Sequence, residues 1–166
     1  DKQIVVTCAS GHRGSITMMA LRMLGYENVV NLGGGINGWK KAELPLEAGV
    51  PAVATVINAS PSVDATRLAG LDAYLSALPE GFFTVKPVDL NTELGTEPKP
   101  VILDVRTSEE TTTDGYIEGS LLVPVTELPT RLAELPTDKT APIVVTCKSG
   151  HRGAMAMVYL QSSYRI

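Results

Sequence analysis

Two cysteines carry the chemistry that this sequence predicts, and each lies in the same short motif. Cys8 belongs to IVVTCASGHRG and Cys147 to IVVTCKSGHRG, and the two copies differ only at Ala9 and Lys148. In each copy the thiol follows an apolar, β-branched run and precedes a glycine and an arginine. Backbone N–H groups of such a turn, with the N-terminus of a following helix, stabilise a thiolate. We therefore predict that both cysteines are nucleophiles.

The other polar residues of the motif are predicted to surround an anionic substrate. Glycine permits backbone conformations that a side chain forbids, arginine supplies a permanent positive charge, and serine supplies a hydroxyl donor. The residues concerned are Ser10, Gly11 and Arg13 in the first copy and Ser149, Gly150 and Arg152 in the second. His12 and His151 follow their cysteines on a tight loop, so we expect them at the rim of the site rather than as catalytic partners.

Other roles for the cysteines are less favoured. A disulfide between Cys8 and Cys147 would use both, and an inert thiol at the end of a strand is the structural alternative. One cysteine and one histidine per copy are too few for a zinc site. We predict two separate thiol sites, with no metal and no other cofactor.

Each predicted site needs a strand before the cysteine and a helix after it. Residues 4–7 and 143–146 read as short buried strands, because they are apolar and β-branched without alternation. Residues 15–24 and 154–161 have the apolar spacing of helices. Alternating strands and helices predict an α/β fold built on a parallel sheet.

The remaining elements are predicted from the same patterns. We expect further strands at residues 28–32, 82–85, 100–106 and 120–124, and helices at 36–42, 64–78, 87–94 and 126–135, with a turn or short helix from Ser108. Residues 50–62 are rich in Ala, Val, Pro and Ser and read as a linker. The long spacing between the two motifs is typical of tandem domains.

Composition narrows the function classes. Of the 166 residues, 44% are apolar and 19% charged, which is typical of a globular chain. The formal net charge of −4 gives no basic surface for nucleic acid. No apolar run is long enough to span a bilayer, and the first residues show no signal-peptide pattern. We expect neither a nucleic-acid nor a membrane partner, and the compartment is not indicated.

Longer stretches around the motif resemble the rhodanese family. IVVTCASGHRG…MLGYENVVNLGGGINGWKKAELPLE is similar to the C-terminal half of a rhodanese domain, and VILDVRTSEETTTDGYIEGSLLVPVTEL is similar to the N-terminal half. The resemblance implies an α/β fold whose parallel sheet is flanked by helices on both faces. It divides the chain into the back half of one domain (1–49), a linker (50–62) and the front part of a second domain with its loop (63–166).

The resemblance also implies an activity. Such a sulfurtransferase takes a sulfane sulfur from a donor such as thiosulfate onto its loop cysteine, as a persulfide, and passes it to cyanide or a thiol. The nucleophile corresponds to Cys8 and Cys147. The substrate-binding loop that follows it, the cradle, corresponds to residues 9–13 and 148–152 and so includes Ala9 and Lys148. The Asp-x-Arg pair of the family corresponds to Asp104, expected to organise the structure, and Arg106, expected near the substrate.

Two other functions stay open at this point. One is a catalytically weak rhodanese-like module that binds a ligand or carries a persulfide. The other is a phosphatase or arsenate reductase, which is disfavoured because related enzymes of that kind have a loop one residue longer than the six residues from Cys8 to Arg13. The chain also departs from the family at residues 115–119, where Gly-Tyr-Ile-Glu-Gly replaces Gly-His-Ile-Pro-Gly.

A back half followed by a front half can form a complete domain in three ways. The chain can fold as one permuted domain, exchange halves with a second copy in a swapped dimer, or be completed by another polypeptide. Unpaired halves would expose sheet edges and apolar surface. We therefore expect half-domain complementation, within one chain or between chains.

Overall fold

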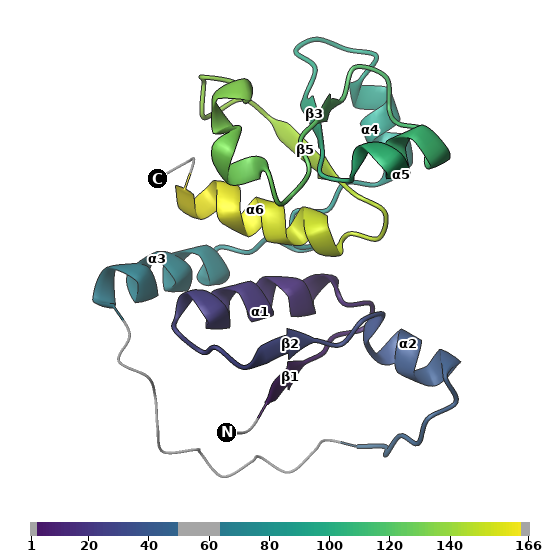
Figure 1. The fold of residues 1–166 in the computed structure, drawn as a ribbon, viewed down its shortest axis with the longest axis vertical. Coiled ribbons are helices and arrows are strands. Elements are labelled where there is room, and N and C mark those ends of the chain that lie inside the picture. Colours follow the sequence, from purple (N-terminus) through teal and green to yellow (C-terminus); the bar gives the residue numbers. More distant parts are fainter. Residues whose placement is uncertain (1–2, 50–63, 164–166) are drawn as a thin grey trace. The chain divides into compact units, whose positions relative to one another are not determined.

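The computed structural model describes residues 3–49 and 64–163 (Figure 1). The chain divides into two compact units, Asp1–Ala77 and Leu78–Ile166, and each is described by itself. The predicted linker, residues 50–62, lies outside the described residues, and the predicted domain limits stay predictions. Within the described ranges, no helix is long and apolar enough to cross a membrane.

The first unit contains a two-stranded parallel sheet. Its elements are β1 (Ile4–Val6), α1 (His12–Met23), β2 (Val29–Asn31), α2 (Gly35–Lys41) and α3 (Ala65–Ser76). β1 pairs in parallel with β2, with Ile4 opposite Val29, so α1 is the crossover between them. Val29, Ile16 and Ala20 are buried, and this small core fixes α1 on the sheet.

The second unit contains a three-stranded parallel sheet in the order β4-β3-β5. Its elements are α4 (Pro87–Glu93), β3 (Val101–Asp104), α5 (Ser108–Asp114), β4 (Leu121–Leu122), β5 (Ile143–Thr146) and α6 (His151–Ser163). Its core is made of Leu103, Val105, Val123, Leu128, Leu135, Ala156 and Leu160. The predicted α/β fold with parallel strands is confirmed.

Helices α6 and α4 cover different faces of this sheet. Ile143 and Val145 of β5 pack against the core to which α6 contributes. Val144 and Thr146, together with part of Val145 and with Leu90 of α4, line an apolar cavity of about 350 Å³. Successive residues of a strand point to opposite faces, which explains why β5 is apolar without alternation.

Two predicted elements are wrong. Residues 82–85 do not form a strand: Phe82 (φ 54°) and Phe83 (φ 57°) lie in a turn and have left-handed backbone conformations that cannot continue a strand. Residues 126–135 form two 3₁₀ turns, Leu128–Thr130 and Leu132–Glu134, instead of one α-helix. Leu128 and Leu135 are nevertheless buried, so core packing rather than helix propensity decides the course of this segment.

The helices after both cysteines begin earlier than predicted. α1 begins at His12 rather than at residue 15, and α6 at His151 rather than at residue 154. Gly11 is the N-cap residue of α1, with a left-handed φ of 99°. Both helix N-termini are therefore brought directly to the loop that contains the cysteine.

The identical strands β1 and β5 use opposite edges for pairing. In the first unit, the N–H of Ile4 and the C=O of Val6 are bonded to the segment around β2. In the second unit, the C=O groups of Pro142 and Thr146 are bonded to the segment around β3. The N–H and C=O groups of successive residues in a strand point to alternate edges. The second edge of β5, which faces away from β3, therefore corresponds to the edge that β1 uses toward β2.

Candidate functional site

The first loop, residues 8–13, points backbone N–H groups at the sulfur of Cys8. The N–H groups of Gly11 and Gly14 donate to Cys8 Sγ at 3.1 and 3.4 Å. The left-handed φ of Gly11, 99°, turns the chain back toward the sulfur. The thiol is half-buried at the end of β1.

The second loop, residues 147–152, repeats this geometry. The N–H groups of Gly150 and Gly153 donate to Cys147 Sγ at 3.1 and 3.3 Å, and Gly150 has a φ of 88°. Both cysteines are free thiols. The same sulfur-binding cradle is thus built twice, once in each unit.

The cradle makes Cys8 more acidic. Burial raises the pKa of the Cys8 thiol, but hydrogen bonds from the backbone N–H groups of Gly14, Gly11, Ser10 and Arg13 together outweigh that effect and leave the pKa below its usual value. A larger fraction of this thiol is therefore present as the nucleophilic thiolate at neutral pH.

The N-terminus of α2, which lies later in the chain, supports the backbone of the first loop. The N–H groups of Ile36 and Asn37 donate to the C=O groups of Cys8 and Ala9 at 2.8 and 2.9 Å. Gly35, with a φ of 57°, packs so closely that a Cβ atom would overlap the carbonyl of Cys8. The N-terminus of α2 therefore packs directly against the first loop and fixes its backbone.

Asn31 of β2 supports the same loop from the side. Its Nδ2 donates to the C=O of Gly11 and to the hydroxyl of Ser15, both at 3.0 Å. Asn31 also lies against Gly14, where a Cβ atom would overlap the Asn31 side-chain oxygen. The position of this loop thus depends on a residue from the neighbouring strand.

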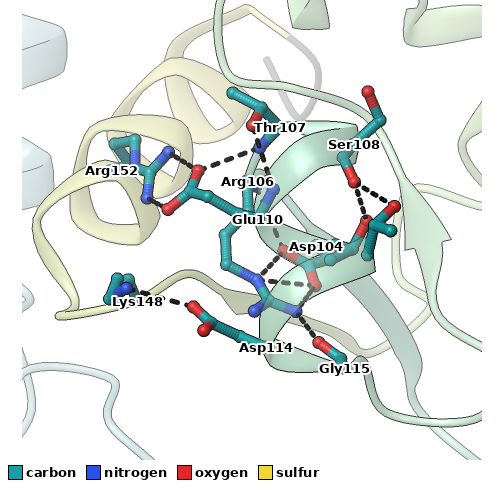
Figure 2. A network of polar contacts seen from close by, with 11 residues as sticks. Asp104, Arg106, Thr107, Ser108, Glu110, Asp114, Gly115, Lys148 and Arg152 are labelled. Atoms are coloured by element: carbon teal, nitrogen blue, oxygen red, sulfur yellow. Dashed lines mark hydrogen bonds and ion pairs between the residues drawn. The ribbon is translucent and has the colours of Figure 1, made fainter.

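The second loop is held by side-chain charges from the segment that precedes it (Figure 2). Arg152 donates from Nη1 and Nη2 to the two carboxylate oxygens of Glu110 in α5, at 2.6 and 2.7 Å. Glu110 Oε2 also accepts from the N–H of Thr107 at 3.1 Å, as part of a capping box at the start of α5. One carboxylate therefore joins the start of α5 to the first turn of α6.

Two further ion pairs lie in the same network. Asp104, whose side chain is 1% exposed, accepts from Arg106 Nε at 2.9 Å and from Nη2 at 2.6 Å. Arg106 Nη2 also donates to the C=O of Gly115 at 2.8 Å, and its hydrogen bonds with Asp104 raise the pKa of the guanidinium. Lys148 of the second loop pairs with Asp114 at 3.0 Å in a more exposed position.

The structure places the two histidines on the first turns of α1 and α6, half-buried. His151 Nδ1 lies 3.4 Å from Ser149 Oγ. His12 Nε2 is enclosed, and no partner for it is present among the described residues. Within the same described part of the chain, no three His, Cys, Asp or Glu residues gather into a metal-binding group.

Several residues that support the loops are not predicted from the sequence. Asn31 and Gly35 support the first loop, and Glu110 and Asp114 contact the second. A signal for Glu110 does exist, because Thr-x-x-Glu before a helical segment is the pattern of a capping box. Asp104, expected to organise the structure, is buried. Arg106, expected near the substrate, donates hydrogen bonds to Asp104 and to the C=O of Gly115.

The chain is similar to proteins of known structure. A search of the curated proteins finds no match. The chain is similar to the solved structure of a thiosulfate sulfurtransferase from Pseudomonas aeruginosa, with 23% identity and a TM-score of 0.46, covering 96% of this chain and 30% of that one. It is also similar to a 3-mercaptopyruvate sulfotransferase from Escherichia coli, with 24% identity and a TM-score of 0.44, covering 98% of this chain and 62% of that one.

This chain therefore spans less than two thirds of either of those proteins. The family model of the rhodanese-like domain matches residues 1–42 and 87–165, which include both loops and make up most of the chain. The chain belongs to the family of rhodanese-like domains.

Proposed function

We propose that the chain is a sulfurtransferase that carries sulfane sulfur on Cys8 and Cys147. In the first step, a cysteine thiolate attacks the outer sulfur of thiosulfate. The new S–S bond forms as the bond to the sulfite group breaks, and sulfite leaves with the electron pair. In the second step, cyanide or a thiolate attacks the terminal sulfur of the persulfide, and the cysteine thiolate is released.

The observation that supports this proposal most directly is the pair of N–H groups at each cysteine sulfur. These donors, at 3.1–3.4 Å, stabilise negative charge on Sγ both before attack and when the thiolate is released. The lowered pKa of Cys8 agrees with this role. The donor is expected to be a small sulfur-containing anion, because the cradle consists of N–H donors beside basic residues.

Mass spectrometry after thiosulfate treatment tests the proposal. We expect one added sulfur atom on Cys8 and one on Cys147, each removed by cyanide with formation of thiocyanate. Cys8→Ser and Cys147→Ser should each abolish loading at the substituted position and leave the other position loaded.

The outcomes separate the alternatives. Full thiocyanate formation by the double variant Cys8→Ser/Cys147→Ser would exclude the mechanism. Loading without turnover would identify a persulfide carrier, and no loading on either cysteine would identify a binding module. Hydrolysis of a generic phosphate ester would favour the phosphatase alternative.

We also propose that two copies of the chain complete their rhodanese-like domains by exchanging halves in a swapped dimer. Support comes from β5, whose second edge corresponds to the edge that β1 uses toward β2. Native mass measurement of the folded chain should detect a dimer, and a strictly monomeric folded chain would exclude the exchange.

A further inference from the structure

The charges around the second loop are matched in pairs. Arg152 is paired with Glu110, and Lys148 with Asp114. The Glu110–Arg152 pair is the less exposed, with side chains 24% and 31% exposed, against 40% and 65% for Asp114 and Lys148. Since less exposed pairs are less screened by solvent, Glu110 is the carboxylate best placed to control the charge of this loop.

Glu110 is itself held at a fixed position. Its Oε2 accepts from the N–H of Thr107, and the hydroxyl of Thr107 accepts in turn from the N–H of Glu110 at 3.3 Å. Both carboxylate oxygens are used by Arg152, in a two-point contact that fixes orientation as well as distance (Figure 2). The start of α5 thereby sets the position of Arg152.

Arg152 lies next to a residue that contacts the reacting sulfur. It directly precedes Gly153, whose N–H donates to Cys147 Sγ at 3.3 Å. Attraction to the Cys147 sulfur also contributes to raising the pKa of the Arg152 guanidinium, after the larger contribution of Glu110. Glu110, Arg152 and the N–H donor of Gly153 are therefore consecutive links between the start of α5 and the Cys147 sulfur.

We propose that Glu110 is a positioning residue for Cys147: it holds Arg152 in place and balances its charge, so that an anion arriving at Cys147 does not meet a free guanidinium. This inference deepens the proposed sulfur transfer, because it assigns the anion selectivity of the second loop to Glu110. The donor anion is then bound by the backbone N–H groups and by Lys148. Lys148 can release Asp114, since that pair is largely exposed.

Alkylation of Cys147 tests the inference without any sulfur transfer. In a Cys8→Ser background, the rates with iodoacetate, an anion, and iodoacetamide, which is neutral, are measured and their ratio is taken. Glu110→Gln removes the balancing charge and should raise the iodoacetate-to-iodoacetamide ratio about three- to fivefold at low salt, the order of magnitude for one unbalanced charge that acts at short range in water. Added salt should reduce the increase.

The neighbouring variant Glu109→Gln is the matched control. It removes the same charge from the same helix, while Arg152 keeps both of its bonds to Glu110. Its ratio should equal that of the background protein, and Glu110→Asp, which keeps the charge, should restore most of the original ratio. A role confined to stability would change both alkylation rates together and leave the ratio unchanged.

Arg152→Gln gives an independent measurement, which also applies if Glu110→Gln does not fold. It leaves the Glu110 carboxylate unbalanced and should lower the ratio below that of the background. Equal ratios for Glu110→Gln and Glu109→Gln, or no decrease for Arg152→Gln, would overturn the inference. Absence of sulfur loading with an intact ratio response would instead overturn only the proposed sulfur transfer.

Discussion

The first and second loops have nearly the same sequence, yet different parts of the chain support them. At the sulfur they agree closely, with N–H donors at 3.1 and 3.4 Å in the first loop and at 3.1 and 3.3 Å in the second. Away from the sulfur they differ. The first is held by backbone contacts and by the Asn31 side chain, from residues that follow it, and the second by ion pairs from residues that precede it.

This difference separates two properties of the motif. The geometry at the sulfur is local, because it follows from a strand, two glycines and a helix N-terminus within one short segment. The stability and charge of the loop are not local, because they depend on which neighbouring elements are present. Substitutions should therefore act on one loop at a time, and site-resolved alkylation of Cys8 and Cys147 along a urea series follows each unit separately.

Asp104→Ala should have the largest effect and should act on the second unit alone. It leaves the Arg106 guanidinium, whose side chain is 12% exposed, without its carboxylate and still bonded to the C=O of Gly115. Removing one member of a buried ion pair costs about 3–5 kcal/mol. In urea, Cys147 should become reactive at a much lower concentration, while the reactivity of Cys8 is unchanged.

Asp114→Ala is the control for this prediction, since it removes an exposed carboxylate from the same network. Its effect should stay below about 1 kcal/mol. Equal losses for the two aspartates would contradict the role given to burial of Asp104.

Gly35→Ala should be the matching disruption of the first loop. An alanine at a φ of 57° is strained, and its Cβ would overlap the carbonyl of Cys8. Backbone strain and overpacking together predict a loss of about 2–4 kcal/mol in the first unit. The fluorescence of Trp39, the single tryptophan, should report the unfolding of this unit.

Gly33→Ala provides the comparison, because a Cβ atom there would meet no atom within 4 Å. It should leave both the unfolding curve and Cys8 alkylation close to those of the parent protein. A Gly35→Ala protein as stable as Gly33→Ala would show that the close contact with α2 does not stabilise the first loop.

The equivalent glycines of the two loops should respond differently to substitution by alanine. Gly14→Ala places a Cβ atom on the Asn31 side-chain oxygen and should destabilise the first unit by about 1–2 kcal/mol. Gly153→Ala meets only ordinary contacts, at 3.6 Å or more, and should be neutral or stabilising by up to about 1 kcal/mol through helix propensity.

Asn31→Ala should rescue Gly14→Ala, because it removes the side chain that the new methyl group would meet. Urea unfolding of the two single variants and the double variant measures this coupling. Additive losses would show that Asn31 is not the cause of the difference between the loops.

The smallest expected effect is a loss of stability of the second unit at acidic pH. The hydrogen bonds from Arg152 lower the pKa of Glu110 from 4.5 to about 2 in the folded protein. The unfolded chain therefore binds a proton at Glu110 more readily than the folded chain does between these values. The stabilisation is complete above about pH 4.5 and is lost as the pH falls toward 2.

Urea unfolding of the second unit between pH 5 and pH 2 measures this slope. In Glu110→Gln the part of the slope due to this carboxylate should disappear, and the first unit provides an internal reference. An unchanged slope in Glu110→Gln would contradict the assignment of the shift to the Arg152 pair.

Much of the fold can be predicted from the sequence where the pattern is local. The strands before both cysteines, the helices after them and the short helix at α4 follow from apolar spacing and glycine positions. The failures lie at residues 82–85 and 126–135, where the apolar pattern is present but long-range packing and left-handed backbone conformations decide the structure. Helix starts are missed because a glycine N-cap gives a weaker signal than Ser, Thr, Asp or Asn.

The sequence by itself determined the two cysteine cradles, since a thiol, two glycines and a helix N-terminus lie within a few residues of one another. Only the tertiary structure decided what holds each cradle. Asn31 lies 20 residues from Gly11, and Glu110 lies 42 residues from Arg152. Contacts across such separations depend on which strands pair and which helices pack beside them, and a local pattern contains no information about either.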